Sequence, residues 1–473
     1  MKTRSATTAP PAVSGALAGL ALTMLLSSLG TSIANVGLPT FVHAFDASFQ
    51  SVQWVVLAYL LAVTTLVVSA GRLGDLFGRR RLMLAGIATF TAASLACAAS
   101  PSLWWLVTAR ACQGFGAAVM MALTMALVGE AVPKERAGRA MGLLGTTSAV
   151  GTALGPSLGG MLIATFGWQA IFLVNLPLGL LAAALVWRFL PRDRSSATTA
   201  GFDLPGTLLL ASALASYSLA MTLGRGHFGA LNIILAGAGV VLGAMFLVVE
   251  SKTPSPLLRP ALFRTHLIGS GFVASGLATT VAMTTLVVGP FYLSGALHLD
   301  ATRTGLAMST GPLVAALAGV PAGKAVDRFG ELRMTMAGLL LMAAGAFLLS
   351  RIAAGHGVHG YVAALVVLTT GFATFQAANN TAVLTGTDPG QRGVVSGLLN
   401  LSRNLGLITG ASLMGAVFMH AAGTSAIATA GTAAVVSATH AVFLLAVVLI
   451  VLALMVVIAP RARTVAGFFP RTR

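Results

Sequence analysis

A short, densely charged segment, residues 71–81, lies between two long runs that contain no charge at all. The flanking runs, 51–70 and 82–100, are each about 20 residues long, the length that an α-helix needs to cross the hydrocarbon core of a bilayer. Two such helices with so short a connection must turn back at one membrane surface, and the glycines of the segment let helix ends approach closely. Because arginines accumulate in cytoplasmic loops, the segment is predicted to be a tight cytoplasmic turn.

The composition supports a membrane protein with many spans. Of 473 residues, 57% are hydrophobic and only 8% are charged, whereas a soluble protein carries roughly a quarter of charged residues. The apolar runs are too long for the strands of a barrel. The formal charge of +17 does not indicate a nucleic-acid partner, because the basic residues cluster in loops where anionic lipid headgroups lie. The predicted location is the bacterial inner membrane, with membrane lipids as partners.

About fourteen helices are predicted to span the membrane. One set of loops holds most of the basic residues and both basic tails, and the other set holds only Arg225, Arg303 and Arg351. Both termini are therefore expected on the cytoplasmic side. The predicted cores are 15–38, 51–70, 82–100, 103–129, 139–164, 168–190, 204–223, 229–249, 266–292, 303–323, 332–350, 359–384, 393–420 and 436–459.

The charged segment has an internal copy. Residues 323–330 repeat the order of residues 71–78: a glycine, three residues, an aspartate, two residues and a glycine. If helices one to six and nine to fourteen form two parallel halves, both copies lie between the second and third helix of their half. The expected organisation is an N-terminal half at 1–190, two inserted helices with linkers at 191–265 and a C-terminal half at 266–473.

The first copy resembles the loop between helices two and three of the major facilitator superfamily, whose pattern is roughly G-x-L-a-D-r-x-G-r-r. The resemblance implies a conformational latch that closes the cytoplasmic side. The alternative is a generic basic loop with one stray acid. An aspartate in such a loop can accept hydrogen bonds from the free N–H groups at the start of a neighbouring helix. The candidate latch residues are Gly71, Asp75, Gly78, Arg79, Asp327 and Arg328.

Arg110 lies inside the fourth predicted helix, where a charge costs several kcal/mol. It resembles the arginine of the superfamily's helix-four pattern, which implies a link to proton transfer, with Gln113 orienting the guanidinium. The alternative is an arginine that extends to the membrane surface. Further candidates for proton coupling are Glu130, predicted at the cytoplasmic end of the fourth helix, and Asp75, predicted in a cytoplasmic loop.

The fifth helix matches the antiporter signature G-x-x-x-G-P-x-x-G-G at Gly151, Gly155, Pro156, Gly159 and Gly160. Glycines at this spacing allow close helix packing, and the proline permits a bend. The resemblance implies an exporter. Together with the count of fourteen helices, it points to the drug:proton antiporter branch. We expect Gly155 and Pro156 to pack against the opposite half when the cytoplasmic side is open.

The first helix resembles the pattern L-D-x-T-x-x-N-x-A-L-P of this branch, but Gly30 stands where the branch has an acid. None of the eleven acids is predicted at mid-membrane. Arg403 is predicted about 16 Å from the cytoplasmic end of its helix, where together with Arg110 it would make a central cavity electropositive. The alternative is that Arg403 pairs with carbonyls or with Asn404 at a helix interface. Other residues could line the cavity or bond between helices: Asn35, Tyr59, Gln376, Asn379 and Asn380.

We therefore expect a proton-driven exporter of small lipophilic compounds, working as a monomer by alternating access. An uncoupled or specific exporter of a neutral or anionic metabolite or lipid is the alternative, and a membrane sensor or scaffold with a transporter fold is a third. No metal-ligand cluster, nucleophile triad or phosphate-binding motif occurs in the sequence, so neither a cofactor nor enzymatic activity is expected. Cys97 and Cys112 lie in apolar runs and are expected to be packing residues.

Overall fold

The computed structural model describes residues 11–131, 134–193, 204–222, 229–253, 266–352, 354–385, 392–423 and 431–466, and the regular structure in these ranges is entirely helical. The first half of the chain forms α1 (Pro11–Val36), α2 (Leu38–Ala44), α3 (Phe49–Phe77), α4 (Arg79–Ala98), α5 (Leu103–Ala131), α6 (Lys134–Phe166), α7 (Ala170–Leu173), α8 (Asn175–Phe189), α9 (Leu204–Thr222) and α10 (Ala230–Lys252). The second half forms α11 (His266–Phe291), η2 (Tyr292–Ala296), α12 (Ala301–Phe329), α13 (Glu331–Ser350), η3 (Ala354–His356), α14 (Gly357–Thr385), α15 (Arg392–Thr409), η5 (Gly410–Met414), α16 (Gly415–Ala422) and α17 (Thr432–Ala466).

The all-helical class predicted from the sequence is confirmed, but the predicted number of spans is not. In the described residues, 12 helices are long and apolar enough to cross a membrane. The apolar parts of α6 and α9, Val150–Phe166 and Leu204–Ala220, are shorter than the others. These two helices account for the difference from the predicted fourteen.

The two repeated charged segments are single-residue breaks between long helices and not extended loops. Gly78, with φ of +92°, separates α3 from α4, and Gly330, with φ of +86°, separates α12 from α13. A residue with a side chain is strained at such a positive φ. The equivalent position of the two glycines supports the internal repeat seen in the sequence.

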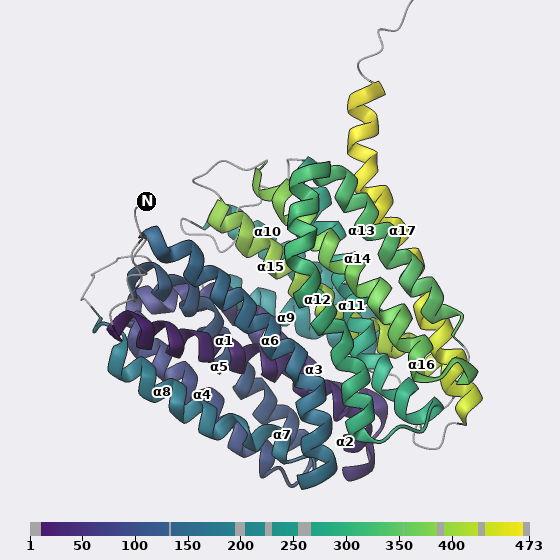
Figure 1. Cartoon of the computed structure of the whole chain (residues 1–473), viewed down its shortest axis with the longest axis horizontal. Helices are drawn as coiled ribbons and strands as arrows, with labels where there is room; N and C mark the ends of the chain where they lie inside the picture. The colour runs from purple at the N-terminus through teal and green to yellow at the C-terminus, as the bar shows by residue number, and fades with distance from the viewer. Residues whose placement is uncertain are drawn as a thin grey trace, which may run out of the picture.

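The helices gather into two bundles that lie side by side (Figure 1). In the N-terminal bundle (α1–α8), α1 packs on α6 and α8, and α5 packs on α3 and α4. In the C-terminal bundle (α11–α17), α11 packs on α15 and α17, and α13 packs on α14. Helices α9 and α10 pack on each other, and α9 also touches α3 and η5. The bundles meet through α6 with α12 and through α3 with α15.

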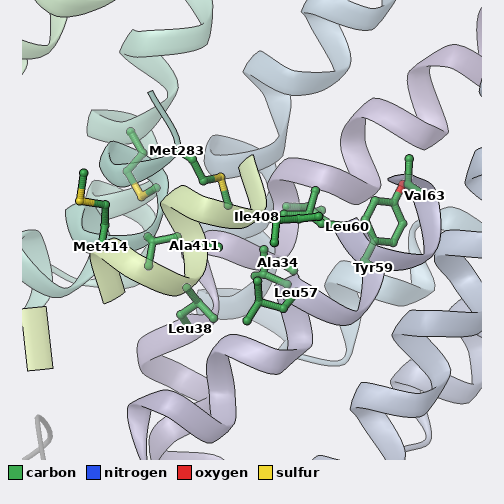
Figure 2. Close-up of a cluster of buried hydrophobic side chains, with 14 of the residues drawn as sticks. Ala34, Leu38, Leu57, Tyr59, Leu60, Val63, Met283, Ile408, Ala411 and Met414 are labelled. Carbon is green, nitrogen blue, oxygen red and sulfur yellow. The ribbon is translucent and has the colours of Figure 1, made fainter. Parts of the chain in front are cut away.

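A cluster of buried apolar side chains joins the two bundles (Figure 2). The N-terminal bundle supplies Ala34, Leu38, Leu57 and Leu60, and the C-terminal bundle supplies Met283, Ile408, Ala411 and Met414. Between membrane-spanning helices, van der Waals packing of such side chains is a main source of association. The methionines add flexible, polarizable side chains that adapt to irregular neighbours.

The bundles are also sealed at the end of the molecule where α2 lies, which we name the α2 end. The ring of Phe49 on α3 lies 4.6 Å from that of Phe291 and 5.8 Å from that of Phe418, both in the C-terminal bundle. One turn along α3, the buried side chain of Gln53 donates a hydrogen bond of 2.8 Å to the carbonyl of Ala411 in η5. Aromatic stacking and one polar bond therefore close this end.

Candidate functional site

Arg110 lies at the centre of the N-terminal bundle and is fully buried. Its Nε donates to the carbonyl of Val55 on α3 at 2.9 Å, and its Nη2 donates to the carbonyl of Gly30 on α1 at 3.0 Å. Its Nη1 donates to Oε1 of Gln113 at 2.5 Å. The guanidinium therefore does not extend to the surface, and each of its nitrogens has an acceptor.

The network continues to two more partners. The Nε2 of Gln113 donates to Oγ of Ser94 on α4 at 2.7 Å. The guanidinium carbon of Arg110 lies 4.2 Å from the centroid of the Tyr59 ring, a cation–π contact, and the Tyr59 hydroxyl donates to the carbonyl of Ser27 at 2.8 Å. Carbonyl dipoles, one amide and one aromatic face thus hold the charge, and they link α1, α3, α4 and α5.

Gly30 faces this network. A Cβ added at Gly30 would lie 3.1 Å from the Tyr59 hydroxyl and 3.3 Å from the ring of Phe90. The position at which the resembled pattern has an acid therefore lies inside the N-terminal bundle, next to Arg110. In this chain the guanidinium bonds the backbone there and not a carboxylate.

The structure describes the side chains of some of the candidate latch and proton-coupling residues and only the backbone of others. The backbone of Gly71 and Asp75 continues α3, and that of Glu130 lies near the end of α5, but the side chains of Asp75 and Glu130 lie outside the description. Asp327 is exposed in the last turn of α12. The guanidinium of its neighbour Arg328 lies 5.3 Å from the ring centroid of Phe329.

An acid that the sequence analysis did not single out caps α4. The carboxylate of Asp193, which follows α8, accepts hydrogen bonds from the backbone N–H of Arg80 at 2.7 Å and of Arg81 at 3.1 Å. A Cβ added at Gly78 would lie 2.6 Å from this carboxylate. The described acid at the start of this helix is thus Asp193, and the contacts expected of Asp75 lie outside the described side chains. No local pattern reveals it, because the partners are 113 residues apart.

The glycine and proline string of α6 serves two contacts. Gly151, Gly155 and Gly159 face α1 of the same bundle, and a Cβ added at Gly155 would overlap the Ser32 hydroxyl. Gly160 faces α12 of the opposite bundle, where an added Cβ would overlap the carbonyl of Ala301. A Cβ added at Gly305 of α12 would in turn overlap the Pro156 carbonyl. Pro156 therefore lies where we expected it, against the opposite bundle, but Gly155 does not.

The remaining polar candidates differ in their surroundings. Asn35 is buried and donates to carbonyls of its own helix at 3.0 and 3.3 Å. Asn379 is buried on α14 and donates to the carbonyl of Gly271 on α11 at 3.1 Å, which makes it an interhelical bond. Asn380 is partly exposed. Gln376 accepts a bond of 3.2 Å from Nη1 of Arg403.

Within the described residues, no group of three or more His, Cys, Asp and Glu side chains could hold a metal ion. Cys97 is buried and Cys112 is exposed, and neither forms a disulfide. The candidate functional features of the described residues are therefore the network around Arg110, the contact between α6 and α12, and the pair formed by Arg403 and Gln376.

Solved structures share this arrangement of helices. A bacterial homologue of the human lysosomal transporter Spinster, in an inward-facing and unoccupied conformation, matches with a TM-score of 0.71 at 15% identity, over 98% of this chain and 100% of that chain. The xylose transporter XylE from E. coli matches with a TM-score of 0.62 at 15% identity, over 93% and 97% of the two chains. At this level of identity the likeness concerns the fold.

Sequence comparison leads to the same family. The uncharacterized transporter YebQ of Escherichia coli is 33% identical over 404 residues, which cover 85% of this chain and 88% of that protein. The multidrug efflux pump LfrA of Mycolicibacterium smegmatis is 30% identical over 422 residues, 88% and 83% of the two chains. The riboflavin transporter RibZ of Clostridioides difficile is 29% identical over 395 residues, 84% and 86% of the two chains. The model of the Major Facilitator Superfamily matches residues 20–411 and 268–472. This chain is therefore a multi-pass membrane protein that belongs to the Major Facilitator Superfamily, whose members are transporters and not enzymes.

Proposed function

We propose that the protein exports small lipophilic compounds across the bacterial cytoplasmic membrane by alternating access, with the regions 1–190 and 266–473 moving as two domains. The observation that carries this proposal is the contact between α6 and α12. There Gly160 and Gly305 bring two backbones together across the bundles. A contact with almost no interlocking side chains can part and re-form without unpacking either bundle. Relatives named as multidrug resistance proteins or efflux pumps support the same function.

Fourteen spans remain the count we propose. Helix α6 has 33 residues and α9 has 19, so they extend about 50 Å and about 28 Å at 1.5 Å per residue. Both lengths suffice to cross or nearly cross the core of a bilayer. With an even number of spans, the basic tails and loops lie in the cytoplasm and the α2 end faces outward. Large exposed apolar side chains on α10, such as Ile233 and Val240, suit contact with lipid around a monomer.

The apolar cluster between the bundles supports a lipophilic substrate. Met283 and Met414 belong to it (Figure 2), and methionines adapt to ligands of varied shape. No acid has a described side chain in the middle of the apolar spans of either bundle, while Arg110 and Arg403 lie within them. A cationic compound would find like charges there, so we propose that neutral or anionic lipophiles are preferred.

We propose that export is driven by the inward movement of protons, with Asp75 and Glu130 as proton carriers. The Arg110–Gln113 pair would set the electrostatic potential at these two acids. The experiment that tests the function is transport by the purified protein in liposomes. A substrate-dependent proton flux is expected, in the direction opposite to substrate movement. Substrate export with no proton movement would leave an uncoupled exporter. One observation favours that second candidate: Arg110 is bound by carbonyls, an amide and a ring, with no carboxylate to exchange a proton.

A further inference from the structure

The two arginines inside the spans are held differently. Arg110 uses all three guanidinium nitrogens on acceptors from its own bundle and stacks on Tyr59. Arg403 on α15 makes one hydrogen bond to a described residue, from Nη1 to Oε1 of Gln376 at 3.2 Å. Its Nε is buried and has no partner. Burying a donor without an acceptor is costly, so a bundle that needed Arg403 only for packing would be expected to satisfy it as it satisfies Arg110.

The vacant edge of Arg403 has a specific shape. With Nη1 engaged, the N–H groups of Nε and Nη2 lie side by side, and no described residue accepts from either. This edge of a guanidinium holds a carboxylate or another planar pair of oxygens in two parallel hydrogen bonds. The residue as a whole is partly exposed, but its Nε is buried, so a ligand would reach this edge only when the helices around it move. The unpartnered edge therefore matches a ligand with two acceptor oxygens.

No described protein carboxylate is placed to fill this edge. The acids with described side chains in the C-terminal bundle are Asp300, Asp327 and Glu331, and all three lie at the ends of α12 or at the start of α13. Arg403 lies eleven residues into α15, about 16 Å from the beginning of that helix. The described acids of this bundle therefore leave the edge of Arg403 without an acceptor.

The surroundings of Arg403 indicate what else the ligand contains. The adjacent Ser402 bonds the carbonyl of Phe272 on α11, so this part of α15 packs against α11. Both α11 and α15 contact the N-terminal bundle, through α1 and α3. Further along α15 and η5 are Ile408, Ala411 and Met414, which belong to the apolar cluster between the bundles (Figure 2). Arg403 and these buried apolar side chains thus follow one another along α15 and η5.

We infer that Arg403, supported by Gln376, is the anchor for the acidic group of a lipophilic organic anion whose apolar body contacts the cluster around Met414. This inference rests on the proposed export of lipophilic compounds and narrows it to weak acids with a planar anionic head. Gln376 acts as a positioning residue, because it fixes Nη1 and leaves the opposite edge of the guanidinium open. Arg110 has no such role, because each of its guanidinium nitrogens already donates to an acceptor in its own bundle.

The test is a binding series with three probes that share one ring system: naphthaleneacetate, naphthaleneacetamide and naphthylethylamine. Binding to the purified full-length protein in nanodiscs is measured by calorimetry. We expect the wild type to bind the acid about 10- to 100-fold more tightly than the amide, the range of charge-assisted hydrogen bonds, and the amine most weakly. Arg403→Gln should bind acid and amide equally. Arg403→Lys, which keeps the charge without the planar edge, should retain only part of the preference.

The matched control is Arg303→Gln, which removes an equal charge at an exposed site where Arg303 pairs with Asp300. It should keep the wild-type preference. Equal binding of acid and amide by the wild type, or an unchanged preference in Arg403→Gln, would overturn the anchor. Efflux of the neutral dye N-phenylnaphthylamine from proteoliposomes is measured in parallel. If the dye is exported but the acid is not preferred, the role of Arg403 is refuted and the proposed export function stands. If the dye is not exported and no probe binds, both proposals are refuted.

Discussion

A single methyl group on Gly160 should open the contact between the bundles. A Cβ at this position would overlap the Ala301 carbonyl and lie 3.2 Å from Cα of Gly305. Both obstacles are backbone atoms, so no side chain can rotate away from the added group. Helices α6 and α12 must therefore separate in Gly160→Ala, by about 1 Å, which forfeits a quarter to a half of the dispersion energy between the atoms that part.

The size of the effect follows from the cost of overpacking. Forcing an extra carbon into a well-packed contact typically costs about 1–3 kcal/mol. That cost applies to the state with α6 and α12 in contact and not to the state in which they have parted. At about 1.4 kcal/mol per tenfold, the equilibrium should shift roughly 5- to 150-fold toward an open α2 end.

The measurement is the distance between spin labels on cysteines that replace Asp46 and Ala433, two exposed positions at the α2 end, one in each bundle. The background carries serine at Cys97 and Cys112, the two cysteines of the chain. Pulsed electron paramagnetic resonance should show a larger fraction of molecules with a long distance between the two labels in Gly160→Ala than in the wild type.

Gly159→Ala is the matched control, because its added Cβ would meet the Val36 side chain on α1, within the same bundle, at 2.8 Å. This variant should lower thermal stability without changing the distance distribution. If Gly160→Ala leaves the distribution unchanged, or if both variants change it equally, the α6–α12 contact does not control opening.

Four further changes test other parts of the structure. Asp75→Asn should lower transport in liposomes at near-normal expression, and full transport would remove the latch role. Gly30→Asp should place a carboxylate beside Arg110, shift ligand preference toward cations and make transport more pH-sensitive; tight binding of dications by the wild type, measured by calorimetry, would contradict the premise. Gln53→Leu loses the bond across the α2 end, so labels at that end should show more open molecules. Asp193→Asn weakens the cap of α4 and should lower stability by about 1 kcal/mol, visible as a lower Tm with transport retained.

The sequence predicts most of the architecture because hydrophobic length and charge are local properties. Uncharged runs give the helices, and the copy of the charged segment points to the equivalent glycine breaks at Gly78 and Gly330. The cap of α4 by Asp193 could not be predicted, since it depends on where the end of α8 lies in space. The tight turn predicted between α3 and α4 consists of one residue, Gly78, because one glycine with a positive φ suffices to separate two helices.

The division of the α6 string could have been read from its spacing. Residues four apart lie on one face of a helix. Gly151, Gly155 and Gly159 form one such row, and Pro156 and Gly160 form a second row, rotated by one residue. The structure assigns the first row to α1 and the second to α12. A signature taken as a single motif therefore contains two packing surfaces, one inside a bundle and one between bundles.

Gly30 and Tyr59 form a matched pair, which the sequence pattern alone does not reveal. The Tyr59 hydroxyl lies 3.1 Å from where a Cβ on residue 30 would lie, closer than most side chains tolerate, and its ring covers the Arg110 guanidinium at 4.2 Å. The tyrosine therefore limits the space for a side chain at position 30 and contacts the guanidinium through its ring. An aspartate at position 30 would fit best if Tyr59 became phenylalanine, since removing the hydroxyl frees the volume that the new side chain needs. The departure from the resembled pattern at Gly30 therefore leaves the network around Arg110 with no described carboxylate.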